Sequence, residues 1–164
     1  MEKINIGTWP LSGDYGYISI NEVYKILTYA FDKKFYEYDT APSYGNGLIE
    51  FILGNVFNGE KKVKFNTKVG NHPFNGKSFE IFDIKKSLDN SLKRLRTNKI
   101  NILYLHNPRL NSKKLEKLID FLNNLKKIRI IRYSGISLAK NFNIENKILE
   151  KFDVIQDDAN ILST

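Results

Sequence analysis

Short apolar segments alternate with amphipathic, helix-like segments along the whole of the 164-residue chain. Strands and helices that alternate in this way favour parallel strands joined by right-handed crossovers. The segments that we expect to form strands are residues 4–10, 35–38, 62–68, 100–105, 128–136 and 152–155. The predicted fold class is therefore α/β, a (β/α) barrel of the TIM type that is incomplete, with about six parallel strands alternating with helices.

A polar side chain lies close to the carboxyl end of each expected strand. These residues are Thr8, Asp39, Lys68, His106, Ser137 and Gln156. Because catalytic residues of such barrels gather where the carboxyl ends of the strands meet, the pattern predicts one shared site. A doubly wound sheet is the alternative fold, and it predicts a glycine-rich phosphate loop after the first strand. Residues 45–50 hold only the first two glycines of such a fingerprint.

Helix signals lie between the expected strands. Ser19 and Glu22 form a capping box that opens the first helix. The buried face of this helix is expected to carry Val23, Ile26, Leu27 and Ala30. Ser112 is expected to cap the helix that precedes residues 128–136, and residues 71–77 are expected to be irregular, with His72 at the surface.

Composition narrows the class of protein. The chain has no cysteine, which excludes disulfides and thiolate chemistry, and it has no apolar run long enough to span a bilayer. An N-terminus without a signal-peptide core then indicates a cytoplasmic protein with no membrane partner. The net charge of +8 would suit an acidic ligand, but most lysines fall on polar helix faces. We therefore expect a solvated lysine-rich surface, no nucleic-acid partner and no metal site.

Four residues would act together if the strand ends converge. They are a carboxylate, a phenol, an ammonium and an imidazole, namely Asp39, Tyr44, Lys68 and His106. A phenol with an ordinary pKa near 10 needs a nearby cation to become a good acid at neutral pH, so we expect Lys68 to lower the pKa of Tyr44. Asp39 would keep Lys68 charged, and His106 would orient a carbonyl oxygen. Such a set suits proton donation to a carbonyl while a cofactor delivers hydride.

Structural roles stay open for the same residues. Asp39 and Lys68 would also make a buried ion pair, and His106 would serve as a hydrogen-bonded histidine at a strand end. Ser137 would cap a following helix, as hydroxyl side chains often do. Tyr44 is the exception, because nothing about a turn requires a phenol.

Longer motifs carry a resemblance to a known family. They are Gly7-Thr8-Trp9, Tyr38-Asp39-Thr40-Ala41 with Tyr44-Gly45-Asn46-Gly47 and Glu50, Thr67-Lys68-Val69-Gly70, Leu103-Tyr104-Leu105-His106-Asn107-Pro108, Gly135-Ile136-Ser137 and Phe152-Asp153-Val154-Ile155-Gln156. In these motifs and in their order the chain resembles the aldo-keto reductases. The resemblance implies a single domain, 1–164, that reduces an aldehyde or ketone to an alcohol with NADP(H), NAD(H) being the second choice of cofactor.

The resemblance also implies catalytic and substrate-binding roles. Tyr44 matches the family's general acid, and Lys68 and Asp39 match the residues that tune it. His106 matches a residue that positions the substrate. Trp9 matches a residue that lines the substrate pocket.

Cofactor-binding roles follow in the same way. Ser137 and Gln156 match positions that hold the nicotinamide carboxamide. Thr8 and Asp39 match positions near the nicotinamide ribose. A small carbonyl compound is the implied partner, and the residues that would choose it are not among these matches.

The chain departs from the family in length. It ends just after the sixth expected strand, without the part that matches the last two barrel strands and that grips the cofactor's phosphates. Leu138 and Ala159 also stand where many members carry Asn and an aromatic residue. Open edges at residues 4–10 and 152–155 raise an alternative function, a catalytically silent remnant or half-barrel that associates with another chain through these edges.

Overall fold

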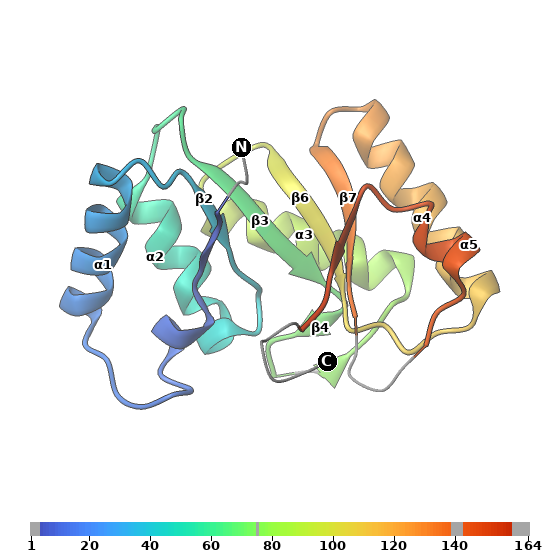
Figure 1. The fold of residues 1–164 in the computed structure, drawn as a ribbon, viewed down its shortest axis with the longest axis horizontal. Helices are drawn as coiled ribbons and strands as arrows, with labels where there is room; N and C mark the ends of the chain where they lie inside the picture. The colour runs from blue at the N-terminus through green and yellow to red at the C-terminus, as the bar shows by residue number, and fades with distance from the viewer. Residues whose placement is uncertain (1–3, 75, 139–142, 159–164) are drawn as a thin grey trace.

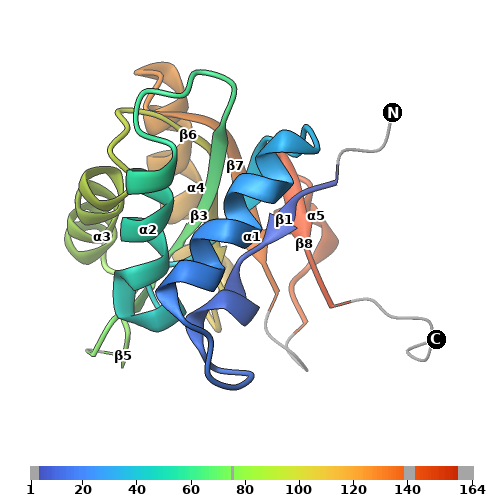
Figure 2. The same cartoon turned by 90° about the vertical axis from the view of Figure 1, so that its left-hand side faces the viewer.

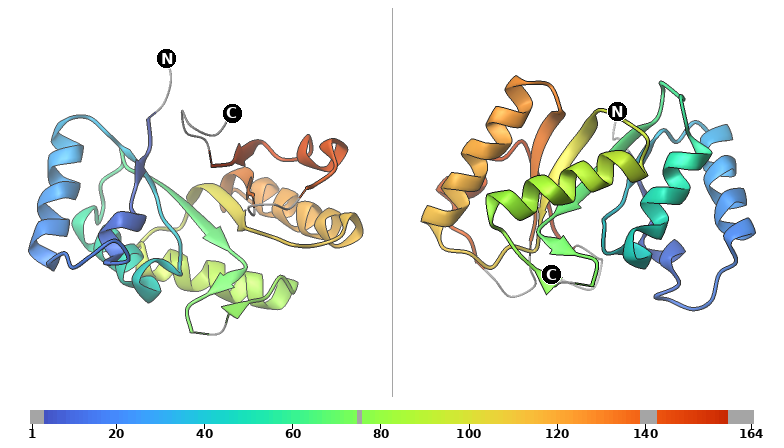
Figure 3. Two further views of the ribbon diagram at one scale, coloured as in Figure 1. Left: turned by 60° about the horizontal axis from the view of Figure 1, so that its bottom comes forward. Right: turned by 180° about the vertical axis from the view of Figure 1, so that it is seen from behind.

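The computed structural model describes residues 4–74, 76–138 and 143–158. A parallel sheet has the strand order β1-β2-β3-β6-β7-β8 and curls into part of a barrel, with the helices on its outer face (Figures 1 and 3). Its strands are β1 (Ile6–Gly7), β2 (Glu37–Asp39), β3 (Lys64–Val69), β6 (Ile100–His106), β7 (Ile131–Ser137) and β8 (Val154–Gln156). The prediction of an incomplete (β/α) barrel is therefore confirmed.

Helices connect successive strands of this sheet. They are α1 (Ile20–Asp32), α2 (Leu48–Val56), α3 (Ile81–Arg94), α4 (Ser112–Lys127) and α5 (Asn146–Leu149). In Figure 2, α2 and α3 lie to the left of β3, whereas the edge strands β1 and β8 lie to its right, on the open side of the sheet. The main apolar core lies between the helices and the sheet, and Leu27, Ile49 and Leu103 are fully buried there.

The helix signals in the sequence are largely confirmed. The Ser19–Glu22 capping box is present at the start of α1. Ile26, however, is 42% exposed, whereas Val23, Leu27 and Ala30 are buried. At 100° per residue Ile26 lies at the side of the buried stripe, so the predicted face was too wide.

Three local predictions were wrong, two about where an element begins or ends and one about a missed hairpin. The first strand stops at Gly7, and Trp9–Ser12 forms a 3-10 helix (η1) with Pro10 in its first turn, where a missing amide hydrogen costs nothing. The N-cap of α4 is Asn111, which accepts a hydrogen bond from the Lys114 amide, and not Ser112. The stretch expected to be irregular contains a small hairpin, β4 (Asn71–His72) with β5 (Gly76–Lys77).

A buried carboxylate fixes the segment that follows β2. Glu50 on α2 is fully buried and accepts hydrogen bonds from Thr67 on β3 at 2.6 Å and from Arg94 on α3 at 2.8 Å. The ion pair with Arg94 offsets the cost of burying its charge. Because α2 starts directly after the 3-10 segment Tyr44–Gly47 (η2), this network holds Tyr44 against the end of the sheet.

Within the described ranges, β1 and β8 each pair with a single strand and form the two edges of the sheet. Ile155 on β8 is 48% exposed. No helix in the described part of the chain combines the length and the apolar character that crossing a bilayer requires.

Close contact between α2 and α3 generates a testable prediction. A Cβ added at Gly54 would overlap the Arg94 carbonyl oxygen and lie 2.8 Å from the Leu95 backbone, neither of which can rotate away. We expect Gly54→Ala to lower the free energy of unfolding by about 3 kcal/mol. Gly7→Ala is the matched control, because nothing lies within 4 Å of its added Cβ. Urea unfolding of the two variants measures the difference, and equal stability would contradict the packing described here.

Candidate active site

A cavity of about 620 Å³ opens at the carboxyl ends of the strands. Parallel pairing aligns these ends. Gly7 is the register partner of Asp39, and His106 is the register partner of Ser137, while β6 also pairs with β3 on its other side. Every site residue predicted from the sequence lines this cavity: Thr8, Trp9, Asp39, Tyr44, Lys68, His106, Ser137 and Gln156. The structure therefore brings together residues that lie up to about 150 positions apart in sequence, as parallel strand ends do in a barrel.

Lys68 and Asp39 form the centre of the site. The Lys68 side chain is 2% exposed, and its Nζ donates hydrogen bonds to Asp39 Oδ1 at 2.5 Å and to the Thr40 carbonyl oxygen at 3.0 Å. Burial lowers the pKa of Lys68 from its ordinary value, and the Asp39 carboxylate opposes that shift. The carboxylate thus favours the charged form of this buried amine beside the cavity.

Tyr44 lies over this ion pair. Two left-handed residues in η2, Gly45 and Asn46, turn the chain so that the Tyr44 ring lies 5.0 Å from Lys68 Nζ. The ring also stacks on Trp9 at 6.2 Å between centroids. Such a contact between a cation and an aromatic face is attractive.

The pKa of Tyr44 corrects one prediction. Burial and the negative charge of Asp39 raise it well above its ordinary value, so the expectation that Lys68 lowers it was wrong for this state. Lys68 gives its hydrogen bonds to Asp39 and Thr40 and contacts the face of the Tyr44 ring. The sequence identified Lys68 and Tyr44, but it did not show that Asp39 and Thr40 would take the hydrogen bonds of the Lys68 ammonium. Tyr44 is consequently a neutral phenol that retains its proton at neutral pH.

His106 also contacts the Tyr44 ring. The two rings meet edge to face, with their centroids 6.4 Å apart. Burial, with the positive charges of Lys68 and Lys77, lowers the pKa of His106 to about 4. Its buried Nδ1 has no hydrogen-bond partner among the described residues. His106 is therefore a neutral imidazole with an unused polar atom.

Asp39 also connects the rim of the cavity. Its backbone carbonyl accepts hydrogen bonds from the Thr8 hydroxyl at 2.8 Å and from the Thr8 amide at 3.0 Å. On the far side, Gln156 Nε2 donates to Asp39 Oδ2 at 3.2 Å. This contact joins β8 to β2 across the open side of the sheet. Ser137 stands next to Gln156 in the strand register and is 9% exposed.

Trp9 lies at the outer wall of the cavity and is 47% exposed. Its indole Nε1 donates to Asp14 at 2.6 Å, and its ring meets Tyr15 edge to face. These contacts hold an apolar surface beside Tyr44. Leu138 also lines the cavity, whereas Ala159 lies outside the described residues.

Sequence reasoning missed Tyr104. This residue is 3% exposed, and its ring lies 5.8 Å from Lys68 Nζ, so that Lys68 has an aromatic ring on two sides. Gly135 makes room for it, because a Cβ there would overlap the Tyr104 ring. The two-residue period of a strand places Tyr104 on the same face as His106, and that signal was available in the sequence.

The charge of the cavity is mainly negative. Its carboxylates are Asp14, Asp39, Asp157 and Asp158. Lys68 is the cation that lines it within the described ranges. No group of three or more histidine and acidic side chains in the described part of the chain is arranged to hold a metal ion.

The lowered pKa of His106 predicts a pH dependence of stability. A histidine with a folded pKa of about 4 and an ordinary value of 6.5 contributes stability that is fully present above pH 6.5 and is lost as the pH falls toward 4. Between pH 7 and about pH 4.5, the wild type should lose about 2–3 kcal/mol more unfolding free energy than His106→Gln. Urea titrations at both pH values measure this, and equal losses would show that His106 is protonated as easily in the folded chain as in the unfolded one.

Sequence comparisons agree with this geometry. The family model described as "Aldo/keto reductase family" matches residues 3–157. Human aflatoxin B1 aldehyde reductase member 2 is 38% identical over 76 residues, which cover 44% of this chain and 21% of that protein. L-galactose dehydrogenase from Arabidopsis thaliana is 27% identical over 143 residues, which cover 84% of this chain and 44% of that protein.

Solved structures share the fold. An aldo-keto reductase from Bacillus halodurans, in its holo form, superposes with a TM-score of 0.83 at 26% identity, covering 98% of this chain and 54% of that one. A Klebsiella pneumoniae aldo-keto reductase in complex with NADPH superposes with a TM-score of 0.70 at 20% identity, covering 92% and 49%. The chain therefore spans about half the length of these relatives. With a family model matching nearly its whole length, the chain belongs to the aldo/keto reductase family.

Proposed function

We propose that this chain carries the proton-donating centre of an NADPH-dependent reductase that converts an aldehyde or ketone to an alcohol. The observation that carries the proposal is the convergence of Tyr44, Lys68 and His106 on one cavity, with Asp39 holding the lysine. Family membership and oxidoreductase relatives support this reaction class. NADP(H) is preferred over NAD(H) because a solved relative binds NADPH.

Each residue has a defined task in the proposed reaction. When bound, a reduced nicotinamide would supply the hydride for the carbonyl carbon of the substrate and would itself become oxidised. Tyr44 gives its phenolic proton to the carbonyl oxygen, which receives the electron pair of the broken C=O π bond. Lys68 stabilises the phenolate that remains, and Asp39 keeps Lys68 charged. Neutral His106 hydrogen-bonds the carbonyl oxygen and so aligns it with Tyr44.

The raised pKa of Tyr44 means that the phenol holds its proton over the neutral range but is a weak acid before substrate binds. The proposed role therefore depends on stabilisation of the phenolate as it forms. Negative charge develops on the substrate oxygen and then on Tyr44 during the reaction. Lys68, 5.0 Å from the ring centroid, is placed to stabilise that charge when it forms.

The cavity also fits the nicotinamide end of the cofactor. Gln156 and Ser137 offer a carboxamide and a hydroxyl on adjacent strands, and Thr8 lies on the opposite side next to Asp39. The contact between Gln156 and Asp39 would have to yield to the bound group. The aspartates around the cavity disfavour phosphate groups there, so we assign only the nicotinamide and its ribose to these residues.

We propose association with another chain as the second candidate function. We also propose that residues 1–164 form a single domain. The edges at β1 and β8, which have no further strand partner within the described ranges, and the exposed Ile155 favour pairing with another chain. Such pairing would also extend the wall of the cavity next to Thr8 and Gln156. The cytoplasmic location and the absence of a nucleic-acid partner stay predictions.

The substitution Tyr44→Phe tests the proposed acid. We expect it to lower the turnover of aldehyde reduction at least about 100-fold, because it removes the proton donor, while the dissociation constant for NADPH changes little. Tyr17→Phe is the matched control, since Tyr17 is 94% exposed and lies outside the cavity.

Turnover is followed as NADPH oxidation with a panel of aldehydes and ketones. Unchanged turnover in Tyr44→Phe would refute the assigned acid. Measurement at several protein concentrations, with a sizing column alongside, tests association. Specific activity that rises with concentration would mean that paired chains form the working site, whereas constant activity in a monomer would count against a need for edge pairing.

A further inference from the structure

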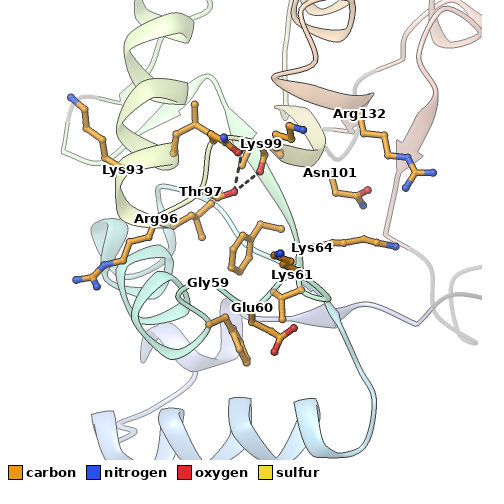
Figure 4. A pocket seen from close by; sticks show the side chains of 17 residues that line it. Gly59, Glu60, Lys61, Lys64, Lys93, Arg96, Thr97, Lys99, Asn101 and Arg132 are labelled. Atoms are coloured by element: carbon orange, nitrogen blue, oxygen red, sulfur yellow. Dashed lines mark hydrogen bonds between the residues drawn. The ribbon is translucent and has the colours of Figure 1, made fainter.

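A second cavity, larger than the first, lies at the opposite end of the sheet. It has a volume of about 1050 Å³ and is formed by the turn after α2, the turn after α3 and the starts of β3, β6 and β7. We call it the basic groove, after the cations that line it (Figure 4). These are Lys61, Lys64, Lys93, Arg96, Lys99 and Arg132. None of the site residues described above contributes to it.

Five of the six groove cations have no acidic partner among the described residues. Lys64 pairs with Glu37 at 3.2 Å, but the other groove cations make no ion pair within the described ranges. The groove has a single acid, Glu60, whose carboxylate accepts a hydrogen bond from the Lys62 amide at 2.9 Å.

Some lysines outside the groove form ion pairs with acidic side chains. Lys126 pairs with Asp153 at 2.5 Å, and Lys151 pairs with Glu116 at 2.7 Å. The cavity at one end of the sheet is thus lined mainly by cations without an ion pair, whereas the cavity at the other end is lined mainly by carboxylates. A potential of this kind attracts an acidic partner to the basic end.

The cations are spread along the groove. In Figure 4, Lys93 and Arg96 extend to one side, Lys64 and Arg132 extend to the other, and Lys61 and Lys99 lie between them. A single phosphate or carboxylate would contact only a few of these groups. An extended ligand with repeated negative charges would contact most of them.

The apolar residues at the floor of the groove favour an acidic polypeptide over a nucleic acid as the extended ligand. Phe57 and Phe65 are only 6% and 7% exposed, so they offer no open ring on which a nucleic-acid base could stack. Val63 and Leu92 are half-buried and offer an apolar surface between the cations. An acidic polypeptide with interspersed apolar side chains matches both features.

We propose that the basic groove is a docking surface for an extended acidic polypeptide segment of a partner protein. The proposal does not rest on the reductase function, because the groove shares no residue with the cavity that contains Tyr44. Carboxylates of the segment pair with the rim cations, and its apolar side chains cover Val63 and Leu92. Charge complementarity of this kind sets the rate of association and the choice of partner.

A fluorescein-labelled peptide in which Glu alternates with Leu and Ser tests the proposal by fluorescence anisotropy with the full chain. We expect saturable binding that weakens as salt is added. The double variant Lys61→Glu/Lys99→Glu should weaken it at least about tenfold. Lys113→Glu/Lys117→Glu is the matched control, because it makes the same change of charge on exposed positions of α4 and should bind like the wild type.

Four outcomes would overturn the proposal. They are no binding, equal weakening in both double variants, equally tight binding of a single-stranded oligonucleotide of the same charge, and a second copy of the chain as occupant. The last would appear on a sizing column as a dimer that depends on Lys61 and Lys99. Circular dichroism of both double variants checks that they fold, and a peptide in which Ser replaces Leu should bind more weakly if the apolar floor is used.

Discussion

The ion pair between Lys68 and Asp39 is the interaction on which the rest of the site depends. Burial disfavours the charged form of an amine that is 2% exposed, the Asp39 carboxylate favours it, and removing one partner of such a buried pair typically costs about 3–5 kcal/mol. The same carboxylate and its backbone connect β1, β2, β3 and β8 through Thr8, Lys68 and Gln156. Asp39 is thus both the electrostatic and the structural centre of the cavity.

Parallel pairing of the strands explains how residues far apart in the sequence come together around Asp39. Register partners such as Lys68 and Tyr104 stand side by side, so each strand delivers its last inward-facing side chain to the same rim. The helices supply the apolar core on the outer face, where Leu103 and Leu105 are fully buried. Because the apolar core lies on the outer face, the inner face of the sheet is free for polar groups.

Much of this arrangement could be predicted from sequence, and the misses have physical causes. Periodicity and strand-end residues predicted the barrel-like order and the rim, because both are local signals. The end of the first strand was missed since Pro10 starts a 3-10 turn. The raised pKa of Tyr44 depends on burial, which only the packed chain determines. Tyr104 was missed although the strand period places it on the face of His106. The basic groove joins Lys61, Lys99 and Arg132, which no sequence window contains together.

Titration of the purified chain with NADPH is the most direct measurement of the central claim, that this cavity works with a nicotinamide cofactor. Trp9 is the single tryptophan and lies in the cavity wall next to Tyr44, so its fluorescence can be followed together with that of the cofactor. Saturable binding that quenches Trp9, and that weakens when Gln156 is changed to Ala, is the expected result. Absence of binding at every accessible concentration, by monomeric and associated chains alike, would contradict the reductase function and leave the four predicted catalytic residues without a cofactor.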